Sequence, residues 1–226
     1  MKHLKIIVVI ATGIFLCNPV QSQTKVNISD LPVTIIPAKR QGPDLMVLYI
    51  SGDGGWNTFS QNLCNQFAAD GVPVVALNSL KYFWSRKTPD ESAQAVTALL
   101  DEYRSVWKKN NILLCGYSFG ADVMPFIYNR LPEILKEKVT RIQLLSPSAY
   151  TDFEIHVSYL FISKKNSVIS EVQKINKPII CYYGEDENDK PLQNVRMPNF
   201  KMVILNGEHH YEKSFAEIVQ SGISPK

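Results

Sequence analysis

The chain has 226 residues, of which 45 % are hydrophobic, and this length and apolar content fit one compact α/β domain with a substantial core. Its formal charge is +3 and no dense basic cluster is present, which argues against a nucleic-acid-binding function. The four cysteines have no spacing that indicates a zinc site, and Cys115 and Cys181 lie in apolar runs, as small buried hydrophobic residues do.

Residues 1–22 have the composition of a secretory signal peptide. A basic start precedes an apolar run at Ile6–Leu16, and Val20–Ser22 offers the residues of a cleavage site. The apolar run is short for a membrane span. A lipoprotein attached at Cys17 is the alternative, but the bulky residue before this cysteine fits it poorly. We therefore expect cleavage near Ser22 and a periplasmic or secreted protein in which residues 23–226 form a single domain.

After this segment, apolar runs alternate with helical patterns. Strands are predicted at 33–36, 45–50, 73–77, 112–115, 139–145, 177–184 and 200–205, with an extra strand or extension over 153–158. Helices are predicted at 59–69, 89–108, 120–130 and 212–220, and a loop at 78–89. This alternation predicts a mostly parallel sheet with helices on both faces. No long insertion follows the strand before Ser146, so we expect a minimal lid or none.

The segment Gly116–Gly120 stands between an apolar run and a helical pattern, and it reads G-x-S-x-G. In this context the pattern is that of a nucleophile elbow, in which glycines avoid crowding at a sharp turn. Ser118 would project above the sheet at a helix N-terminus, where the dipole favours negative charge. An ordinary glycine turn is the alternative. Acids and histidines follow downstream in the order Ser, acid, His, which favours an α/β-hydrolase fold.

A catalytic serine needs a base, usually a histidine. Beyond residue 22 the chain contains His156, His209 and His210. His156 alternates with apolar residues, which indicates a structural role. His209 is the preferred base because Gly-x-His-His-Tyr places it like the histidine of similar endings in this fold, and His210 is the alternative.

The acid that orients the base is expected just after the strand that ends at Gly184. The usual pattern of the fold places it three residues after this glycine, at Glu187. Asp189 and Asp186 are alternatives in the same loop. A weaker possibility after the preceding strand consists of Asp152 and Glu154.

The oxyanion formed during acyl transfer needs preorganised N–H donors. One is expected from Phe119, directly after the nucleophile. The other is expected from the loop that follows the strand 45–50, at Asp53 or Gly54, where glycines allow the backbone to turn its amides toward the site. A plain glycine turn is the alternative.

Other side chains near these motifs are candidates for substrate binding. Asp53 and Asp122 would oppose a developing negative charge, so they either bind a cationic substrate group or cap a loop or helix. Trp56, Trp84 and Arg86 are the remaining candidates. Together with Tyr82 and Lys87, the last two would form an aromatic and basic rim for an acyl chain or a phosphate; a solvated loop is the alternative.

With these residues identified, the chain resembles the VirJ/AcvB family of exported bacterial proteins. The matching segments are Tyr49–Trp56, Tyr82–Pro89, Gly116–Val123, Tyr128–Pro132, Phe153–Val157, Tyr183–Asp189 and Gly207–Tyr211. The resemblance implies a periplasmic α/β-hydrolase. AcvB-type members hydrolyse lysyl-phosphatidylglycerol, and VirJ was described as a virulence factor linked to type IV secretion.

Two hypotheses follow for the function. The first is a serine esterase that needs no metal or cofactor and cleaves an aminoacyl-phospholipid, or another carboxylic ester or thioester, in contact with a membrane surface. The second is a binding or chaperone protein on a hydrolase scaffold that assists secretion-system proteins. The presence of serine, histidine and acids favours the first.

Overall fold

The computed structural model of the chain describes residues 26–155 and 166–224. The predicted signal peptide and His156 lie outside the described residues. Part of the segment 153–158, predicted as an extra strand or extension, also lies outside them, and its described part, 153–155, is not a strand.

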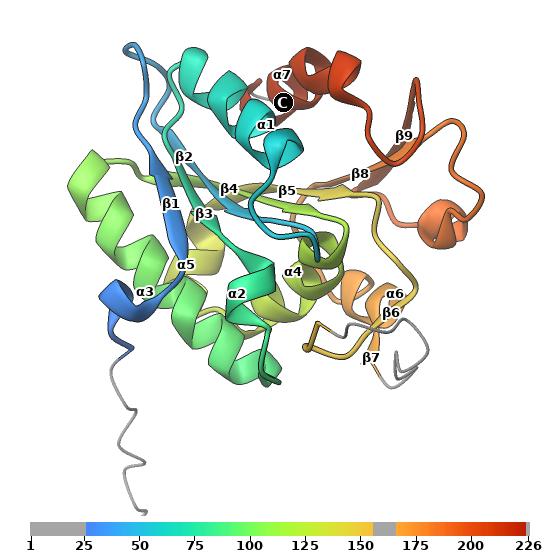
Figure 1. Cartoon of the computed structure of the whole chain (residues 1–226), viewed down its shortest axis with the longest axis horizontal. Coiled ribbons are helices and arrows are strands. Elements are labelled where there is room, and N and C mark those ends of the chain that lie inside the picture. Colours follow the sequence, from blue (N-terminus) through green and yellow to red (C-terminus); the bar gives the residue numbers. More distant parts are fainter. Residues whose placement is uncertain (1–25, 156–165, 225–226) are drawn as a thin grey trace, which may run out of the picture.

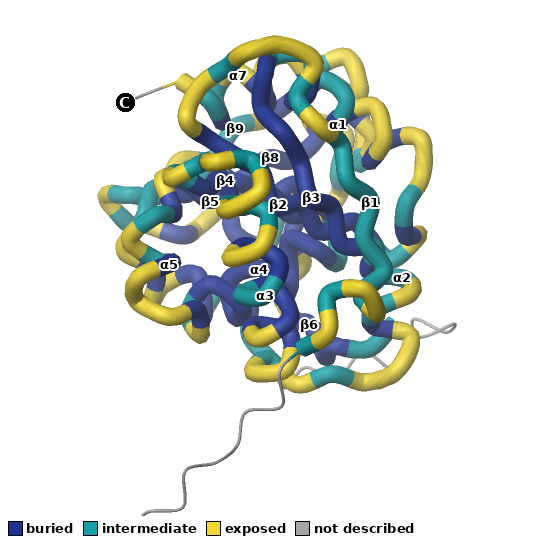
Figure 2. Tube along the Cα trace, turned by 90° about the vertical axis from the view of Figure 1, so that its left-hand side faces the viewer, coloured by how far each residue is buried: buried dark blue, intermediate teal, exposed yellow. Residues whose placement is uncertain are grey.

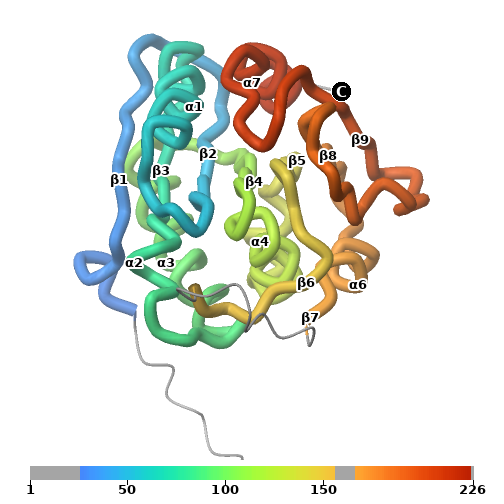
Figure 3. Tube along the Cα trace, turned by 45° about the vertical axis from the view of Figure 1, so that its right-hand side comes forward, coloured from blue at the N-terminus to red at the C-terminus, as the bar shows by residue number. Residues whose placement is uncertain are grey.

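Within the described residues, seven strands form one sheet in the order β1-β3-β2-β4-β5-β8-β9, and Figure 3 shows them side by side in this order. Only the β1–β3 pair is antiparallel, so the prediction of a mostly parallel sheet is confirmed. The strands are β1 Val33–Ile36, β2 Leu45–Ile50, β3 Val74–Leu77, β4 Asn111–Tyr117, β5 Val139–Leu145, β8 Ile179–Gly184 and β9 Phe200–Leu205. The parallel strands β2, β4, β5, β8 and β9 all end at one edge, where α/β proteins place their sites.

Helices cover both faces of the sheet (Figure 1). The helices are α1 Thr58–Ala69, α2 Ser79–Tyr82, α3 Pro89–Trp107, α4 Phe119–Arg130, α5 Glu133–Lys138, α6 Val168–Val172 and α7 Phe215–Ile223, with 3-10 turns at Ile28–Asp30, Pro191–Asn194 and Glu212–Ser214. A hydrophobic core lies on each face of the sheet, and alternate residues of β2 contribute to each of them. Met46 and Leu48 face α3 and α4, whereas Val47 and Tyr49 face α1 and α7. All six residues of β2 are buried, as its continuous apolar run predicts. Figure 2 shows that the central strands and α4 are mostly buried, whereas the edge strand β1 is only partly buried.

Several segments differ from the prediction, including the helices α5 and α6, which were not predicted. The predicted loop 78–89 contains the short helix α2, because the side chain of Asn78 caps its first turn by accepting from the Lys81 N–H. The predicted final helix begins with the 3-10 turn Glu212–Ser214 and is α-helical only at Phe215–Ile223. After β5, the two-residue strands β6 Tyr150–Thr151 and β7 Asn166–Ser167 pair in an antiparallel ribbon. Within the described ranges, no helix combines the length and the apolar character that a bilayer crossing requires.

Candidate active site

The predicted nucleophile elbow, Gly116–Gly120, occupies the junction of β4 and α4. Ser118 has φ 50° and ψ −118°, a backbone conformation that side-chain-bearing residues rarely adopt. The two glycines around it are required sterically. A Cβ on Gly116 would lie 2.4 Å from the Gly120 carbonyl oxygen, and a Cβ on Gly120 would lie 2.1 Å from the Ile50 carbonyl oxygen. The G-x-S-x-G spacing therefore follows from the close packing of this turn against the end of β2.

The hydroxyl of Ser118 is not used to cap the helix that it begins. The backbone carbonyl of Ser118 accepts from the N–H groups of Ala121 and Asp122 at 2.8 and 3.0 Å, but its side chain makes no capping hydrogen bond. The amides of Phe119 and Gly120 precede these first helical bonds, so they point out of the helix N-terminus with the positive end of its dipole. This arrangement places N–H donors beside a half-buried hydroxyl.

The predicted oxyanion loop lies against Ser118. A Cβ on Gly52 would stand 3.3 Å from the Cβ of Ser118. The loop closes as a turn in which the Gly55 N–H donates to the Gly52 carbonyl at 3.0 Å. The Gly54 N–H, one of the two predicted loop donors, is engaged inside this turn, because it donates to Asp53 Oδ1 at 2.9 Å. The Gly52–Asp53 peptide is therefore the part of the loop that adjoins Ser118.

A residue outside the predicted set holds this loop in place. The hydroxyl of Ser79, at the start of α2, donates to the Ser51 carbonyl at 2.5 Å, and the Ser79 N–H donates to Ser51 Oγ at 3.0 Å. Both serines are fully buried. The only sequence signal for Ser79 is its position two residues after the end of β3, since the adjacency of this strand to β2 is a property of the fold.

Glu187 and His209 come together at the ends of β8 and β9. His209 Nδ1 lies 3.1 Å from Glu187 Oε2, and the second carboxylate oxygen accepts from Ser146 Oγ and from the Gly184 N–H, each at 2.6 Å. The loop that carries His209 crosses directly over the end of β8, where a Cβ on Gly184 would lie 2.2 Å from the Glu208 carbonyl oxygen. Burial acts to raise the pKa of Glu187, but the hydrogen bonds from His209, Ser146 and Gly184 outweigh it and lower that pKa. Glu187 is therefore held as a carboxylate.

The two neighbouring histidines have different surroundings. The ring of His209 lies 5.3 Å from the ring of Tyr117, the residue before Ser118, and the His209 side chain is 43 % exposed. His210 is exposed, and its Nδ1 lies 3.0 Å from the Tyr117 hydroxyl while its ring packs against Phe59. Since Nδ1 of His209 is bonded to Glu187, its Nε2 is the nitrogen left to act on a hydroxyl.

Among the described residues the Ser118 hydroxyl donates no hydrogen bond, so Ser118 and His209 are not hydrogen-bonded in this structure. Such contacts are often long in the absence of substrate and tighten in the complex. The alternative acids Asp186 and Asp189 are exposed, and within residues 26–155 and 166–224 neither bonds a histidine. Asp152 is buried, and Glu154 forms an ion pair with Arg86 at 2.8 Å.

The predicted aromatic and basic rim around Trp84 and Arg86 is joined to the elbow by a contact between two aromatic rings. The ring of Phe119 packs 5.0 Å from that of Phe83, whose neighbour Trp84 is 64 % exposed. Arg86 is engaged by Glu154, as above, and the rim is tied to the segment after β6 because the Lys87 N–H donates to the carbonyl of residue 153. Trp56 is half-buried and packs on the core that α1 and α7 cover.

Asp122 lies in the first turn of α4, is 6 % exposed, and accepts from the Ser148 N–H at 2.5 Å through Oδ1. It therefore caps the loop that follows β5, which is one of the two roles that the sequence left open. Burial raises the pKa of Asp122 to about 7, the nearby charge of Asp53 adds to this increase, and the bonds from Ser148 and the charge of His209 oppose it.

The raised pKa predicts how stability depends on pH. Below its ordinary pKa near 4, Asp122 is protonated in the folded and unfolded states alike. As the pH rises toward 7, unfolding releases its proton to water, so the wild type loses stability over this range. Asp122→Asn keeps an acceptor oxygen for Ser148 but has no charge to bury.

We therefore expect Asp122→Asn to gain stability relative to the wild type between about pH 4.5 and pH 8, by about 1–4 kcal/mol. Urea unfolding of both proteins at the two pH values measures this difference. Asp101→Asn, at an exposed position of α3, is the matched control and should show no such change. A stability difference between Asp122→Asn and wild type that is the same at both pH values would contradict the burial of a shifted carboxyl group.

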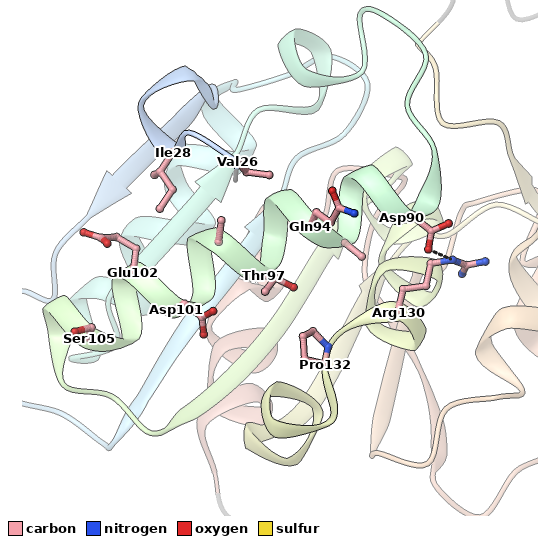
Figure 4. Close-up of a pocket in the computed structure, with 12 residues that line it drawn as sticks. Val26, Ile28, Asp90, Gln94, Thr97, Asp101, Glu102, Ser105, Arg130 and Pro132 are labelled. Atoms are coloured by element: carbon pink, nitrogen blue, oxygen red, sulfur yellow. Dashed lines mark ion pairs between the residues drawn. The ribbon is translucent and has the colours of Figure 1, made fainter. Parts of the chain in front are cut away.

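A surface groove of about 730 Å³ runs along α3 and does not belong to this site (Figure 4). It is lined by residues of α3, by the segment before and within Ile28–Asp30, and by Arg130 and Pro132. Arg130 pairs with Asp90 at 3.5 Å across its end. None of the predicted catalytic residues lines it. The described residues contain no group of three or more histidine, cysteine and acidic side chains that could hold a metal ion.

Residues 44–224 match the family model described as Bacterial virulence protein (VirJ). The chain belongs to the VirJ family. The resemblance predicted from the sequence is thereby confirmed, and the match covers Ser118, Glu187 and His209. No curated protein matches this VirJ-family chain.

Solved hydrolase structures share the fold of this VirJ-family protein. Est1E from Butyrivibrio proteoclasticus aligns with a TM-score of 0.59 at 14 % identity, over 84 % of this chain and 90 % of Est1E. Proline iminopeptidase from Mycobacterium smegmatis gives 0.59 at 14 %, over 84 % and 93 %. An alpha-beta serine hydrolase homologue from Coxiella burnetii gives 0.55 at 15 %, over 84 % and 89 %. The predicted α/β-hydrolase fold is confirmed, and at these identities the likeness concerns the fold alone.

Proposed function

We propose that this protein is an exported serine esterase with Ser118 as nucleophile, His209 as base and Glu187 as the acid that orients it. The observation that carries the proposal is the Glu187–His209 hydrogen bond at the sheet edge where the strained Ser118 turn also stands. Neither feature is needed for a sheet to fold, and together they form the arrangement that activates a serine hydroxyl.

In the proposed reaction, His209 Nε2 takes the Ser118 proton as Oγ forms a bond to the ester carbonyl carbon. The carbonyl electron pair moves onto oxygen, where the Phe119 amide and the Gly52–Asp53 peptide would donate to it. The C–O bond to the alcohol then breaks, and His209 returns the proton to the leaving alcohol. Water repeats the sequence on the acyl-enzyme and releases the acid.

We propose that the substrate is an aminoacyl-phospholipid of the lysyl-phosphatidylglycerol type, which the protein hydrolyses at a membrane surface facing the periplasm. Two acids stand near the nucleophile: Asp53 in the loop beside Ser118, and Asp122 four residues along α4. Their charges interact with one another and, for Asp122, with His209. Because Asp122 is buried and bonded to the Ser148 N–H, Asp53 is the acid that would meet the substrate. A cationic acyl group would offset the negative charge of Asp53, whereas a fatty acyl group would not. Trp84 would then face the lipid.

Asp53→Asn is expected to reduce kcat/KM for a lysyl ester about 10- to 100-fold more than kcat/KM for a neutral acyl ester of the same alcohol, because a charge-assisted contact contributes about 1.5–3 kcal/mol. The measurement is release of lysine from lysyl-phosphatidylglycerol beside release of a short fatty acid from the matched glycerol ester. A norleucyl ester, which keeps only the α-ammonium group, tells which charge of the lysyl group is bound.

Asp101→Asn removes a charge far from the site and is the control. Equal losses on both esters in Asp53→Asn would remove the support for a cationic substrate and leave the esterase in place. Failure of the purified wild type to hydrolyse any ester would argue against the esterase itself. Family membership alone would then favour a binding role in secretion.

A further inference from the structure

Ser146, the first residue after β5, has a second unusual backbone conformation near the site. Its φ is 52°, in the left-handed region, and it is 4 % exposed. The Ser146 N–H donates to the Tyr182 carbonyl at 2.8 Å, which continues the β5–β8 pairing by one residue. A serine that keeps such a conformation beside a candidate site is held by its surroundings for a reason other than local propensity.

The Ser146 hydroxyl lies between Glu187 and Tyr211, which is on the loop that carries His209. It donates to Glu187 Oε1 at 2.6 Å, so its lone pairs are left to accept from the Tyr211 hydroxyl at 3.0 Å. Tyr211 is 1 % exposed, and burial raises its pKa well above the ordinary value, so its hydroxyl keeps its proton. The direction of donation is therefore Tyr211 to Ser146 to Glu187.

This chain of donors decides which carboxylate oxygen serves the histidine. Glu187 Oε1 is occupied by Ser146 and by the Gly184 N–H, which leaves Oε2 for His209 Nδ1. Tyr211 lies two residues after His209. The segment that carries the proposed base therefore also reaches back, through Ser146, to the acid that orients that base.

We propose that Ser146 and Tyr211 are positioning residues that fix the rotamer and the ionised state of Glu187, and through it the orientation of His209. This inference rests on the proposed function and extends it to two residues outside the triad. Neither residue touches the reacting atoms. Ser146 acts on Glu187 directly, and Tyr211 acts only through Ser146.

Ser146→Ala is expected to lower kcat about 10- to 100-fold with little change in KM, as the loss of a hydrogen bond to a charged group does. Loss of this donor also raises the pKa of Glu187, so the acid-side fall of activity should move to higher pH. Tyr211→Phe should lower kcat by less than 10-fold, as loss of a neutral hydrogen bond does. The double variant should match Ser146→Ala, because among the described residues the hydrogen bonds that link Tyr211 to Glu187 pass through Ser146.

Two further variants separate positioning from folding. Ser146→Gly removes the hydroxyl and suits the left-handed backbone, so it should be as impaired as Ser146→Ala while folding at least as well. Tyr182→Phe removes another buried tyrosine hydroxyl, one that contacts Gln143 and Ser221 instead of the acid, and should leave kcat and the pH profile unchanged. A fully active Ser146→Gly with an unmoved pH profile would overturn the inference.

The inference can be tested apart from turnover. The Nδ1 proton of His209, bonded to Glu187, should give a downfield proton resonance in the wild type that disappears in His209→Gln. We expect this resonance to shift or broaden in Ser146→Gly and to persist in Tyr182→Phe. If the wild type hydrolyses no ester but the resonance responds in this way, the positioning network stands and the proposed function fails. If the esterase is active and the resonance does not respond, the positioning network fails alone.

Discussion

Replacing Ser118 by alanine is expected to reduce ester hydrolysis by about 10⁴- to 10⁶-fold, to the level that binding and the oxyanion donors alone can provide. The covalent step needs a nucleophile at the point where the turn presents Oγ. Its neighbours, Phe119 above all, cannot replace it because their contribution is a backbone N–H. Initial rates on a soluble ester, with wild type and variant at equal concentration, measure this loss.

The fold of Ser118→Ala should be intact, because the Ser118 side chain makes no capping bond and no other hydrogen bond among the described residues. Circular dichroism and the thermal midpoint provide that control. Ser60→Ala is a matched serine variant away from the site: Ser60 is buried, its hydroxyl pairs with Tyr49, and its loss should cost stability and not chemistry. Hydrolysis by Ser118→Ala within 10-fold of the wild-type rate would contradict the assignment of Ser118 as the nucleophile.

The second large effect is a difference between two adjacent histidines. His209→Ala is expected to lower kcat by about 10³- to 10⁶-fold, because His209 is the histidine that Glu187 orients as the proposed base. His210→Ala should lower it by less than about 10-fold, since His210 Nδ1 is engaged by the Tyr117 hydroxyl and the ring packs on Phe59. The pair differs by one position in the chain and shares one loop, so each variant controls for damage to that loop.

Glu187→Gln completes this test, with an expected loss of about 10³- to 10⁴-fold, because the neutral amide no longer holds the imidazole in the required tautomer. Asp189→Asn, in the same loop and exposed, should be near wild type. The kinetic comparison of the four variants on one soluble ester decides the assignment. A larger loss in His210→Ala than in His209→Ala would exchange the roles of the two histidines.

The sequence predicts the parts of this site that depend on local pattern. The apolar run 45–50, the G-x-S-x-G turn and the glycine three residues before Glu187 are each short segments whose chemistry limits the backbone to few conformations. The order of Ser, acid and His then places them on one edge of a parallel sheet. Ser118, Glu187 and His209 accordingly stand at the ends of β4, β8 and β9.

Ser146, Ser79 and the role of Asp122 could not be predicted in this way. Ser146 reaches Glu187 only because β5 and β8 are neighbours, and Ser79 reaches Ser51 only because β3 lies beside β2. Strand order and register are properties of the whole sheet. For Asp122 the sequence left substrate binding and capping open, because the partner that decides between them, the Ser148 N–H, is a backbone group that carries no sequence signal.

The amide of Gly54 illustrates the same limit on a smaller scale. A glycine-rich loop after β2 correctly indicates that the backbone turns there, and Gly52 does approach Ser118. Which N–H faces the site depends on the turn geometry, and here the Asp53 side chain accepts the Gly54 amide. Residue identities therefore locate the loop, whereas the torsion angles select its donor.

Labelling of the purified protein with a fluorophosphonate tests the central claim most directly, because the reagent reacts with a serine only where a base activates it and oxyanion donors receive the phosphonyl oxygen. We predict that wild type and His210→Ala are labelled at Ser118, that Ser118→Ala is not labelled, and that His209→Ala is labelled at a sharply reduced rate. A well-folded wild type that takes up no label, or a label that mass spectrometry places on a residue other than Ser118, would contradict an active serine at this site.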